Sequence, residues 1–357
     1  MFKDAASIGD GSVPGLHLWT AHQPASMLER RMAKKFLITG GAGFIGSHLA
    51  ERLLRDNHTV TVLDDLSTGR MGNIQQLLDR PGFQFVNDSV ENESTVGTLM
   101  AQCDAVFHLA SAVGVQLVAN EPVRTIRTTI HGTEVVLESA NRYRRPILIT
   151  SSSEVYGKGS RVPFSEDDDV VMGATRFSRW CYAYSKGIDE FLALAYHKQF
   201  SLPTVVVRLF NTVGPRQVGM YGMVLPRFVE AALANRDLQV YVDGKQTRCF
   251  CHVTDVVDAM SRLIGQAEAV GEVFNLGSDE EISIEDLARK VIARAGSSSR
   301  IEHISYEQAY GQQFDDMMRR VPKTEKIRRA IGFSPTKNLD QIIESVIADH
   351  RGNSAAT

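Results

Sequence analysis

Two residues of this sequence, Tyr182 and Lys186, form a pair whose spacing suits acid–base chemistry. They lie four positions apart in a segment expected to be helical, so both side chains project from one face of the helix. The phenol of an isolated tyrosine has a pKa of about 10. A neighbouring ammonium favours the phenolate and would lower that pKa, which makes the tyrosine a usable general base. Because Tyr and Lys often share this spacing in ordinary helices, the pair alone indicates no function.

Hydroxyl groups precede this pair by about thirty residues. Ser152, Ser153 and Glu154 follow the apolar run 146–150, which we expect to be a strand. A serine hydroxyl at the end of a strand can hydrogen-bond a substrate alcohol while Tyr182 removes the alcohol's proton. Hydride would then leave for a nicotinamide. These residues predict the oxidation of an alcohol, provided that the chain also binds a dinucleotide.

A glycine-rich turn predicts that dinucleotide site. Gly40, Gly43 and Gly46 lie between a short apolar run at 36–39 and a helical pattern at 44–56. Glycines between a strand and a helix let the amide groups of the helix N-terminus approach a pyrophosphate. The turn therefore indicates a phosphate-binding loop of the dinucleotide-binding type.

An acidic residue follows where such a site needs one. The run 59–63 reads as a second strand and ends at Asp64, about 18 residues past the last glycine. A carboxylate there accepts hydrogen bonds from the ribose hydroxyls and repels a 2′-phosphate, which favours NAD over NADP. Arg70 is close enough in the sequence to leave NADP open.

The elements that must position these residues alternate along the first half of the chain. Short β-rich runs occur at 36–39, 60–64, 83–86, 105–109, 147–150 and 204–209. Helical patterns fall between them at 44–56, 72–79, 93–101, 122–142 and about 180–200. This alternation predicts an α/β fold, a Rossmann-like doubly wound parallel sheet with helices on both faces. Ligands bind beyond the carboxyl ends of such strands, where the polar residues above are found.

The second half of the chain is less regular. Helices are expected at 222–235, 283–295 and 338–350, and a strand near 238–242. We expect residues 1–33 to be an N-terminal extension, and 34–210 to form the NAD-binding Rossmann domain with a return segment near 250–276. Residues 211–249 and 277–350 are expected to form a smaller, interleaved substrate-binding lobe.

Composition excludes several other classes of function. The 357 residues carry a net charge of −3, so charge favours neither nucleic acid nor an anionic membrane as a partner. No apolar run approaches the about 18 residues of a membrane-spanning helix. Cys103, Cys181, Cys249 and Cys251 lack metal-ligand spacing, so we expect no metal, reduced thiols and a cytoplasmic protein.

Taken in this order, the motifs resemble those of the extended short-chain dehydrogenase/reductases, in the group of nucleotide-sugar epimerases, dehydratases and decarboxylases. The resemblance runs from about Lys34 to the C-terminal helices. It implies that Tyr182 is the base, that Lys186 orients the ribose and that Ser152 binds the sugar hydroxyl. NAD would take hydride from C4 of the sugar and return it later.

The resemblance also implies the residues that surround the ligands. Those expected at the cofactor, besides Tyr182 and Lys186, are Gly40, Gly43, Phe44, Ile45, Gly46, Asp64, Asp65, Ser67, Thr68, Asp88, Ser89, Leu109, Ala110 and Ser111. Those expected at the nucleotide-diphosphate sugar are Arg179, Asn211, Arg216, Arg248 and Arg320. Arginine forks suit phosphate oxygens, and on the alternative interpretation these arginines are surface charges.

The members of this group differ in what happens to the 4-keto sugar. Dehydratases usually carry Asp-Glu where this chain has Ser153-Glu154, so elimination is disfavoured. Decarboxylases carry Ser-Glu there and an arginine three residues before the tyrosine, as Arg179 stands before Tyr182. The loop Ala112–Val118, however, looks more like an epimerase loop.

We therefore predict an NAD-dependent nucleotide-sugar 4-epimerase, with a nucleotide-hexuronate decarboxylase as the alternative. A 4,6-dehydratase, a keto-sugar reductase and a silent sugar-nucleotide-binding protein remain further alternatives. Glu154 is interpreted either as a contact to a substrate hydroxyl or as a structural acceptor. The family resemblance also predicts a homodimer that associates through the helices near 93–101 and 122–142.

Overall fold

The computed structural model describes residues 33–112, 114, 118, 120–219, 223–310 and 317–354. Residues 33–357 form one compact unit. The predicted N-terminal extension lies outside the described residues, apart from Ala33. No helix among the described residues has the length and apolar character needed to cross a bilayer.

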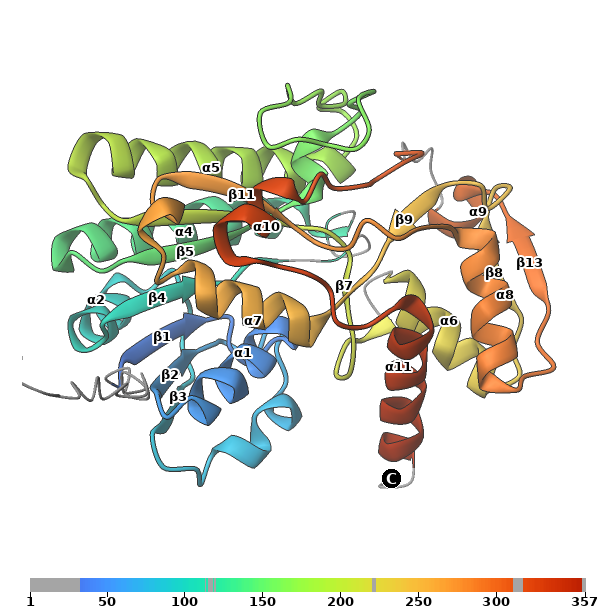
Figure 1. The fold of residues 1–357 in the computed structure, drawn as a ribbon, viewed down its shortest axis with the longest axis horizontal. Helices are drawn as coiled ribbons and strands as arrows, with labels where there is room; N and C mark the ends of the chain where they lie inside the picture. Colours follow the sequence, from blue (N-terminus) through green and yellow to red (C-terminus); the bar gives the residue numbers. More distant parts are fainter. Residues whose placement is uncertain are drawn as a thin grey trace, which may run out of the picture. The chain divides into compact units, whose positions relative to one another are not determined.

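A seven-stranded parallel sheet forms the centre of this unit (Figure 1). In spatial order its strands are β11 (Glu272–Leu276), β6 (Thr204–Leu209), β5 (Ile147–Ser152), β4 (Ala105–His108), β1 (Lys35–Thr39), β2 (Thr59–Leu63) and β3 (Phe83–Val86). The direction of the strand order reverses between β1 and β4. Strand β1 pairs in parallel with β2 on one side and with β4 on the other, so Thr39 lies opposite Leu63 and His108. Polar residues that follow β1, β2, β4 and β5 therefore meet at one edge of the sheet.

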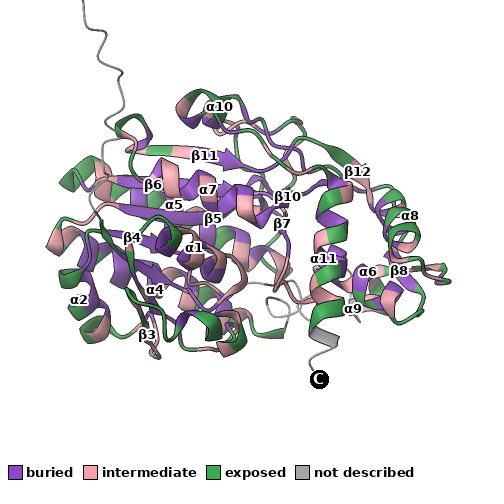
Figure 2. Ribbon diagram, turned by 60° about the horizontal axis from the view of Figure 1, so that its bottom comes forward, coloured by how far each residue is buried: buried purple, intermediate pink, exposed green. Residues whose placement is uncertain are grey.

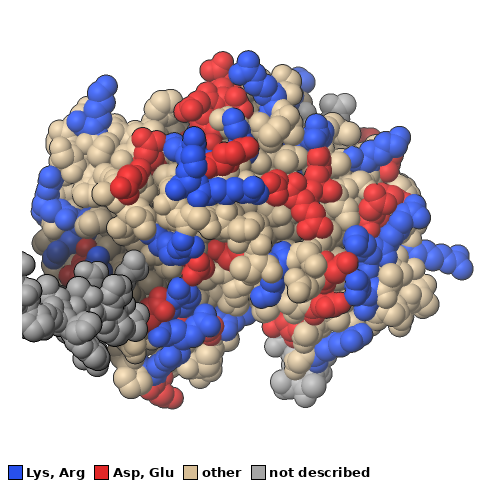
Figure 3. Space-filling model, in the orientation of Figure 1, with Lys and Arg blue, Asp and Glu red and all other residues tan. Residues whose placement is uncertain are grey.

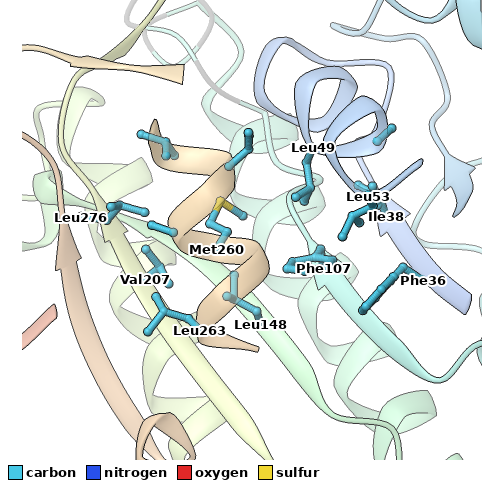
Figure 4. Close-up of a cluster of buried hydrophobic side chains, with 14 of the residues drawn as sticks. Phe36, Ile38, Leu49, Leu53, Phe107, Leu148, Val207, Met260, Leu263 and Leu276 are labelled. Carbon is cyan, nitrogen blue, oxygen red and sulfur yellow. The ribbon is translucent and has the colours of Figure 1, made fainter. Parts of the chain in front are cut away.

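Helices cover both faces of the sheet, as the alternating pattern predicted. Helices α1 (Phe44–Arg55) and α7 (Val253–Leu263) pack on one face, and α2 (Glu93–Gln102), α4 (Pro122–Tyr143) and α5 (Arg179–Phe200) on the other. Successive strand residues alternate between the two cores: Ile38 contacts the α1 and α7 side, shown in Figure 4, and Leu37 the opposite side. The fold is the predicted doubly wound α/β fold.

A second hydrophobic core lies apart from the sheet. It is formed by α6 (Val224–Leu233), α8 (Ile284–Ala295), α11 (Leu339–Ser354) and β8 (Leu238–Tyr241), which pairs with β13 (Ile301–Ile304). Figure 1 shows these elements grouped together on the right. The smaller pieces are β7 (Thr212–Val213), β9 (Thr247–Cys249), β10 (Cys251–His252), β12 (Glu281–Ser283), η5 (Ala267–Ala269) and α9 (Tyr306–Tyr310).

The chain passes more than once between the two cores. It leaves the sheet after β6, and α7 and β11 return to it. Helix α10 (Glu325–Ile331) then packs Ile327 and Ile331 into the core beneath the sheet, although this segment falls within the lobe predicted over 277–350. The exact division of the chain into domains remains a prediction.

The predicted helix at 72–79 is wrong. The chain there makes two short 3₁₀ turns, η1 (Met71–Asn73) and η2 (Gln75–Leu77). Ile74 separates them with φ of −120°, a non-helical angle, because its side chain turns fully into the core. Burial of one apolar residue therefore outweighs the local helical pattern.

Burial and charge follow the layers. In Figure 2 the strands of the sheet are mostly buried, and the outer faces of α2, α8 and α11 are exposed. On the face of the molecule drawn in Figure 3, Lys and Arg are interspersed with Asp and Glu, so this face has no extended patch of one sign.

Candidate active site

A cavity of about 460 Å³ opens beside the carboxyl ends of the strands. The glycine turn, the ends of β2, β4, β5 and β6, helix α5 and parts of the second core line it. With one exception, Ser89, every residue predicted at the cofactor or the sugar nucleotide lies in its wall. The residues brought together are Gly40, Gly43, Phe44, Ile45, Gly46, Asp64, Asp65, Ser67, Thr68, Asp88, Leu109, Ala110, Ser111, Ser152, Ser153, Glu154, Arg179, Tyr182, Lys186, Asn211, Arg216, Arg248 and Arg320.

The glycine turn leaves no room for side chains at two of its positions. Gly40 has φ of +71°, and a Cβ atom there would lie 2.7 Å from the backbone nitrogen of Ala110. A Cβ atom on Gly46 would collide with the carbonyl oxygen of Gly40. Both neighbours are backbone atoms, so they cannot rotate away, and the sequence must carry glycine here.

Helix α1 begins at this turn, and its first residues lie in the cavity wall. Among the described residues, no side chain caps the helix and no acidic residue lies in its first turn. Phe44, Ile45 and Gly46, which carry the first amides of the helix, line the cavity. Uncapped amides at a helix N-terminus fit the phosphates of a dinucleotide.

Asp64 is held rigidly at the end of β2. The amide of Ala42 donates to Oδ2 at 2.9 Å, and the amide of Leu66 donates to Oδ1 at 2.8 Å. Burial raises the pKa of this carboxyl above its usual range, and the two amide bonds oppose that shift. The Gly43 amide also lowers the pKa by a hydrogen bond to this carboxylate. The backbone thus orients a carboxylate at the end of β2, where it can accept hydrogen bonds from ribose hydroxyls.

Asp88 lies at the cavity as expected, whereas the neighbouring Ser89 does not line it. Asp88 lines the cavity, and its Oδ2 accepts hydrogen bonds from Asn92 at 2.8 Å and from the Thr95 hydroxyl at 2.6 Å. Hydrogen bonds from Thr95 and from the Ser89 amide lower the pKa of the Asp88 carboxyl. Ser89 is not among the lining residues; its hydroxyl accepts from the Glu91 amide at 3.2 Å, within the turn that leads to α2. The prediction that Ser89 contacts the cofactor is not supported by this placement.

Tyr182 and Lys186 do lie on one face of α5, but their electrostatics differ from the expectation. Lys186 Nζ is 3.2 Å from Asp189 Oδ2, so its charge is balanced one turn further along the helix. Burial raises the pKa of Tyr182, and the carboxylates of Glu154 and Asp189 raise it further. In the protein alone these effects raise the pKa of Tyr182 above its ordinary value, and the expectation that Lys186 lowers it stays a prediction.

Two serines at the end of β5 accompany the tyrosine. The hydroxyl of Ser152 is hydrogen-bonded to Tyr182 and accepts from the Glu154 amide at 3.2 Å. Ser153 is buried and begins the 3₁₀ turn η3 (Ser153–Tyr156). Ser152 thus stands beside the phenol, as the proposed acid–base chemistry requires.

Glu154 lies between two guanidinium groups. Its Oε2 is 3.2 Å from Arg179 Nη2, and its Oε1 is 2.7 Å from Arg320 Nη2. Both arginine side chains are 9% exposed, so this is a largely desolvated cluster of charges. Arg179 comes from the start of α5 and Arg320 from the segment after residue 317, so the cluster ties distant parts of the chain together.

The remaining predicted substrate residues also have contacts within the protein. Arg248 Nη1 donates to the carbonyls of Thr247 at 2.8 Å and Met317 at 2.9 Å. Asn211 Nδ2 donates to the Cys249 carbonyl at 2.9 Å. Arg216 Nη2 pairs with Glu51 of α1 at 2.6 Å, so this arginine links the glycine-turn helix to the region after β7.

Sequence reasoning missed several residues of the cavity wall. Arg227, Tyr241 and Tyr306 line its outer end, where the ring centroids of the two tyrosines are 5.6 Å apart. The guanidinium of Arg227 lies 4.6 Å from the centre of the Tyr241 ring. These residues come from α6, β8 and α9, and no motif links them in the sequence, so only the fold could reveal them.

The comparisons with known proteins agree with this site. A family model described as GDP-mannose 4,6 dehydratase matches residues 37–346. The chain belongs to this family. It is an extended short-chain dehydrogenase/reductase, as the sequence motifs predicted.

Two curated relatives are decarboxylases. A UDP-N-acetyl-alpha-D-glucosaminuronate decarboxylase of Bacillus cytotoxicus is 40% identical over 317 residues, which cover 88% of this chain and 97% of the relative. A UDP-glucuronic acid decarboxylase 1 of Xenopus tropicalis is 34% identical over 91% of this chain and 74% of the relative. Neither relative is described as an epimerase.

A solved structure with bound ligands has the same fold. The UDP-glucuronic acid 4-epimerase of Bacillus cereus, in complex with UDP-glucuronic acid and NAD, superimposes with a TM-score of 0.81. The two chains are 28% identical, over 89% of this chain and 99% of the epimerase. This chain is thus an NAD-dependent enzyme of the nucleotide-sugar group, and the predicted cofactor is confirmed.

Proposed function

We propose that this enzyme decarboxylates a UDP-hexuronate, and that UDP-N-acetylglucosaminuronate is the first substrate to test. Glu154 clamped between Arg179 and Arg320 beside Tyr182 is the observation that carries the proposal. The two decarboxylases among the relatives support it. The 4-epimerase predicted first from the sequence has less support, because it depended on the loop Ala112–Val118, of which residues 113 and 115–117 lie outside the described part of the chain.

The charge of the cavity suits an acidic sugar. Among its described lining residues, eight are Lys or Arg and four are Asp or Glu, so cations exceed anions. The diphosphates of the cofactor and of the sugar nucleotide would neutralise part of this excess positive charge. A carboxylate on C5 of the sugar would neutralise more of the positive charge, whereas a neutral hexose would not.

The proposed first step oxidises the sugar at C4. Tyr182 accepts the proton of the C4 hydroxyl, and Ser152 holds that oxygen by a hydrogen bond. NAD, when bound by the glycine turn and Asp64, would supply the hydride acceptor for C4. Lys186, whose ammonium is paired with Asp189, would donate a hydrogen bond to the ribose of the bound cofactor.

The carboxylate of the oxidised sugar is β to the new ketone. The C5–C6 bond then breaks, its electron pair moves towards O4, and carbon dioxide leaves. The negative charge passes from the carboxylate to O4, where the Tyr182 hydroxyl and Ser152 donate hydrogen bonds. A proton is added at C5 before C4 is reduced, so one hexuronate and one proton give one pentose and one carbon dioxide.

The charge of Glu154 favours the release of carbon dioxide at this site. Its carboxylate already occupies one side of Arg179 and Arg320, so these cations stabilise a second carboxylate less strongly. Two carboxylates close together disfavour the ground state, in which the sugar carries its charge at C6. Moving the charge to O4 relieves this repulsion, which favours decarboxylation over simple epimerisation.

The experiment incubates the NAD-loaded enzyme with UDP-N-acetylglucosaminuronate, UDP-glucuronate and the matching neutral UDP-hexoses. Products are resolved by mass spectrometry and NMR. Loss of carbon dioxide from a hexuronate supports the proposal. Unchanged mass with inverted C4 would establish an epimerase, and loss of water would establish a dehydratase.

We further propose that the enzyme is a homodimer that associates through α4 and α5. The exposed large apolar side chains of these helices are Val123 and Ile126 on α4, and Tyr184, Ile188, Phe191 and Phe200 on α5. The sequence predicted α2 and α4 instead, but none of the large exposed apolar residues lies on α2. Phe191, 76% exposed, is the most direct test: Phe191→Glu should give a monomer in light scattering, and a monomeric unaltered enzyme would refute the dimer.

A further inference from the structure

Asp189 is a buried acid that the mechanism above does not use. It lies one turn after Lys186 on α5, with its Oδ2 3.2 Å from Lys186 Nζ. The side chains of Lys186 and Asp189 are only 2% and 0% exposed. A buried pair of opposite charges at this distance fixes both side chains and reduces the field that the ammonium exerts on other groups.

The groups packed around Asp189 leave Lys186 as its ionic partner. The adjacent acid, Glu190, pairs with Arg208 of β6 at 2.8 Å. Burial raises the pKa of the Asp189 carboxyl, and the Lys186 ammonium opposes that shift. On α4, the hydroxyl of Thr133 donates to the Thr129 carbonyl at 2.7 Å. Thr133 also lies 3.0 Å from Nε2 of His108 on β4, and burial lowers the pKa of His108 to about 3, so this imidazole is neutral.

Tyr182 is surrounded by charges from several elements. Lys186 and Asp189 share its helix, and Glu154 faces it from η3. Arg179 and Arg320 hold Glu154. With the Lys186 charge balanced, the carboxylates of Glu154 and Asp189 disfavour the phenolate, and Ser152 opposes them by a hydrogen bond.

We propose that Asp189 is a positioning residue that balances the Lys186 ammonium and thereby determines the pH at which Tyr182 loses its proton. The proposal rests on the role of Tyr182 in the proposed function. With Asp189 in place, the phenolate that accepts the C4 hydroxyl proton forms only at higher pH. The proton that Tyr182 returns when the sugar is reduced is the one that it took from C4. Without the carboxylate, the full charge of Lys186 would act on the phenol, and Tyr182 would ionise at lower pH.

The test is a titration of tyrosinate absorbance in the NAD-loaded protein, without substrate. The Tyr182→Phe variant identifies the contribution of Tyr182. Asp189→Asn should move the midpoint of that contribution to lower pH by about one unit or more, the size expected for a nearby charge. Asp255→Asn is the matched control, because Asp255 is a buried acid of α7 that bonds Thr336 and lies outside the cavity wall. An unchanged or raised midpoint in Asp189→Asn would overturn the proposal.

Two further variants separate this effect from a structural one. Asp189→Glu keeps the negative charge and should leave the midpoint pH unchanged. Asp189→Ser replaces the carboxylate with a smaller neutral side chain and should lower the midpoint pH. If both neutral variants fail to fold while Asp189→Glu folds, the carboxylate serves the fold and the proposal is wrong. Because no sugar is turned over, a negative result for decarboxylation leaves this test intact. Where a substrate is found, the acid limb of its kcat/KM profile should move in the same direction as the midpoint.

Discussion

The two ends of the cavity are built in different ways. At the cofactor end, backbone groups form the binding site. The glycine turn, the first amides of α1, and Asp64 held by backbone amides lie within one stretch of about thirty residues. At the sugar end, charged side chains form the binding site. Glu154, Arg179 and Arg320 come from segments that are distant in the sequence. The first end defines the family, and the second determines which reaction follows oxidation.

This difference has a physical basis. A backbone cradle depends on local geometry, so a glycine pattern of fixed spacing specifies it. A cluster of desolvated charges depends on tertiary packing, and moving one member changes the electrostatics of all the others. Substitutions at the two ends should therefore fail in different ways, one by losing the cofactor and the other by changing the chemistry.

Tyr182→Phe, which removes the group between the two ends, should have the largest effect. We expect kcat to fall by roughly 10²–10⁴-fold, the usual range for loss of a general acid–base group. NAD should remain bound, because the phenyl ring has the same shape. The measurement is turnover together with the amount of NAD that co-purifies. Retained turnover would refute the role of Tyr182.

Gly46→Ala tests the cofactor end. The added methyl group collides with the Gly40 carbonyl, so we expect NAD affinity to fall by about 100-fold, or about 2.7 kcal/mol. Equilibrium dialysis with NAD measures this. Gly97→Ala on α2 is the control, since a Cβ atom there meets nothing within 4 Å. Equal NAD binding by both variants would contradict the account of the turn.

Glu154→Gln tests the sugar end, since it keeps the size of the side chain and removes the charge. Decarboxylation should slow by about tenfold or more, while KM for the hexuronate falls, because Arg179 and Arg320 then hold the sugar carboxylate more strongly. The separate changes in kcat and KM are the measurement. Glu281→Gln, which removes an acid paired with the exposed Arg319, should change neither. A raised KM with unchanged kcat would contradict the proposed repulsion.

Arg320→Gln should have the smallest effect of these changes. It removes one of two cations near the sugar carboxylate, so kcat/KM for a hexuronate should fall by about tenfold. The neighbouring Arg319→Gln is a close control, because Arg319 points outward to Glu281 at 2.7 Å. The measurement is a comparison of kcat/KM for a hexuronate between the two variants. Equal losses would assign the effect to the segment rather than to the cavity.

The cofactor end was the more predictable of the two. The spacing of Gly40, Gly43 and Gly46, followed by Asp64, is a local pattern, and it led directly to the fold and to NAD. The role of Ser89 stays a prediction, since a serine beside an aspartate can serve a turn as easily as a ligand.

The sugar end could be predicted only as a set of residue types. Tyr182, Lys186, Ser152 and Arg179 were recognised, but their mutual electrostatics were not. The spacing of Lys186 and Asp189, three positions apart on one helix, permits an ion pair, but the burial that makes this pair matter depends on the tertiary packing of α5. Nor does it indicate that Arg320 reaches Glu154, a contact that exists only after the chain has folded.

The central claim is that Glu154 and its two arginines direct the 4-keto sugar to lose carbon dioxide. Its most direct test is the mass of the product formed from UDP-N-acetylglucosaminuronate and from UDP-glucuronate by the NAD-loaded enzyme. We predict a UDP-pentose lighter than the substrate by one carbon dioxide, released in equal amount. A product of unchanged mass with inverted C4 would contradict the claim.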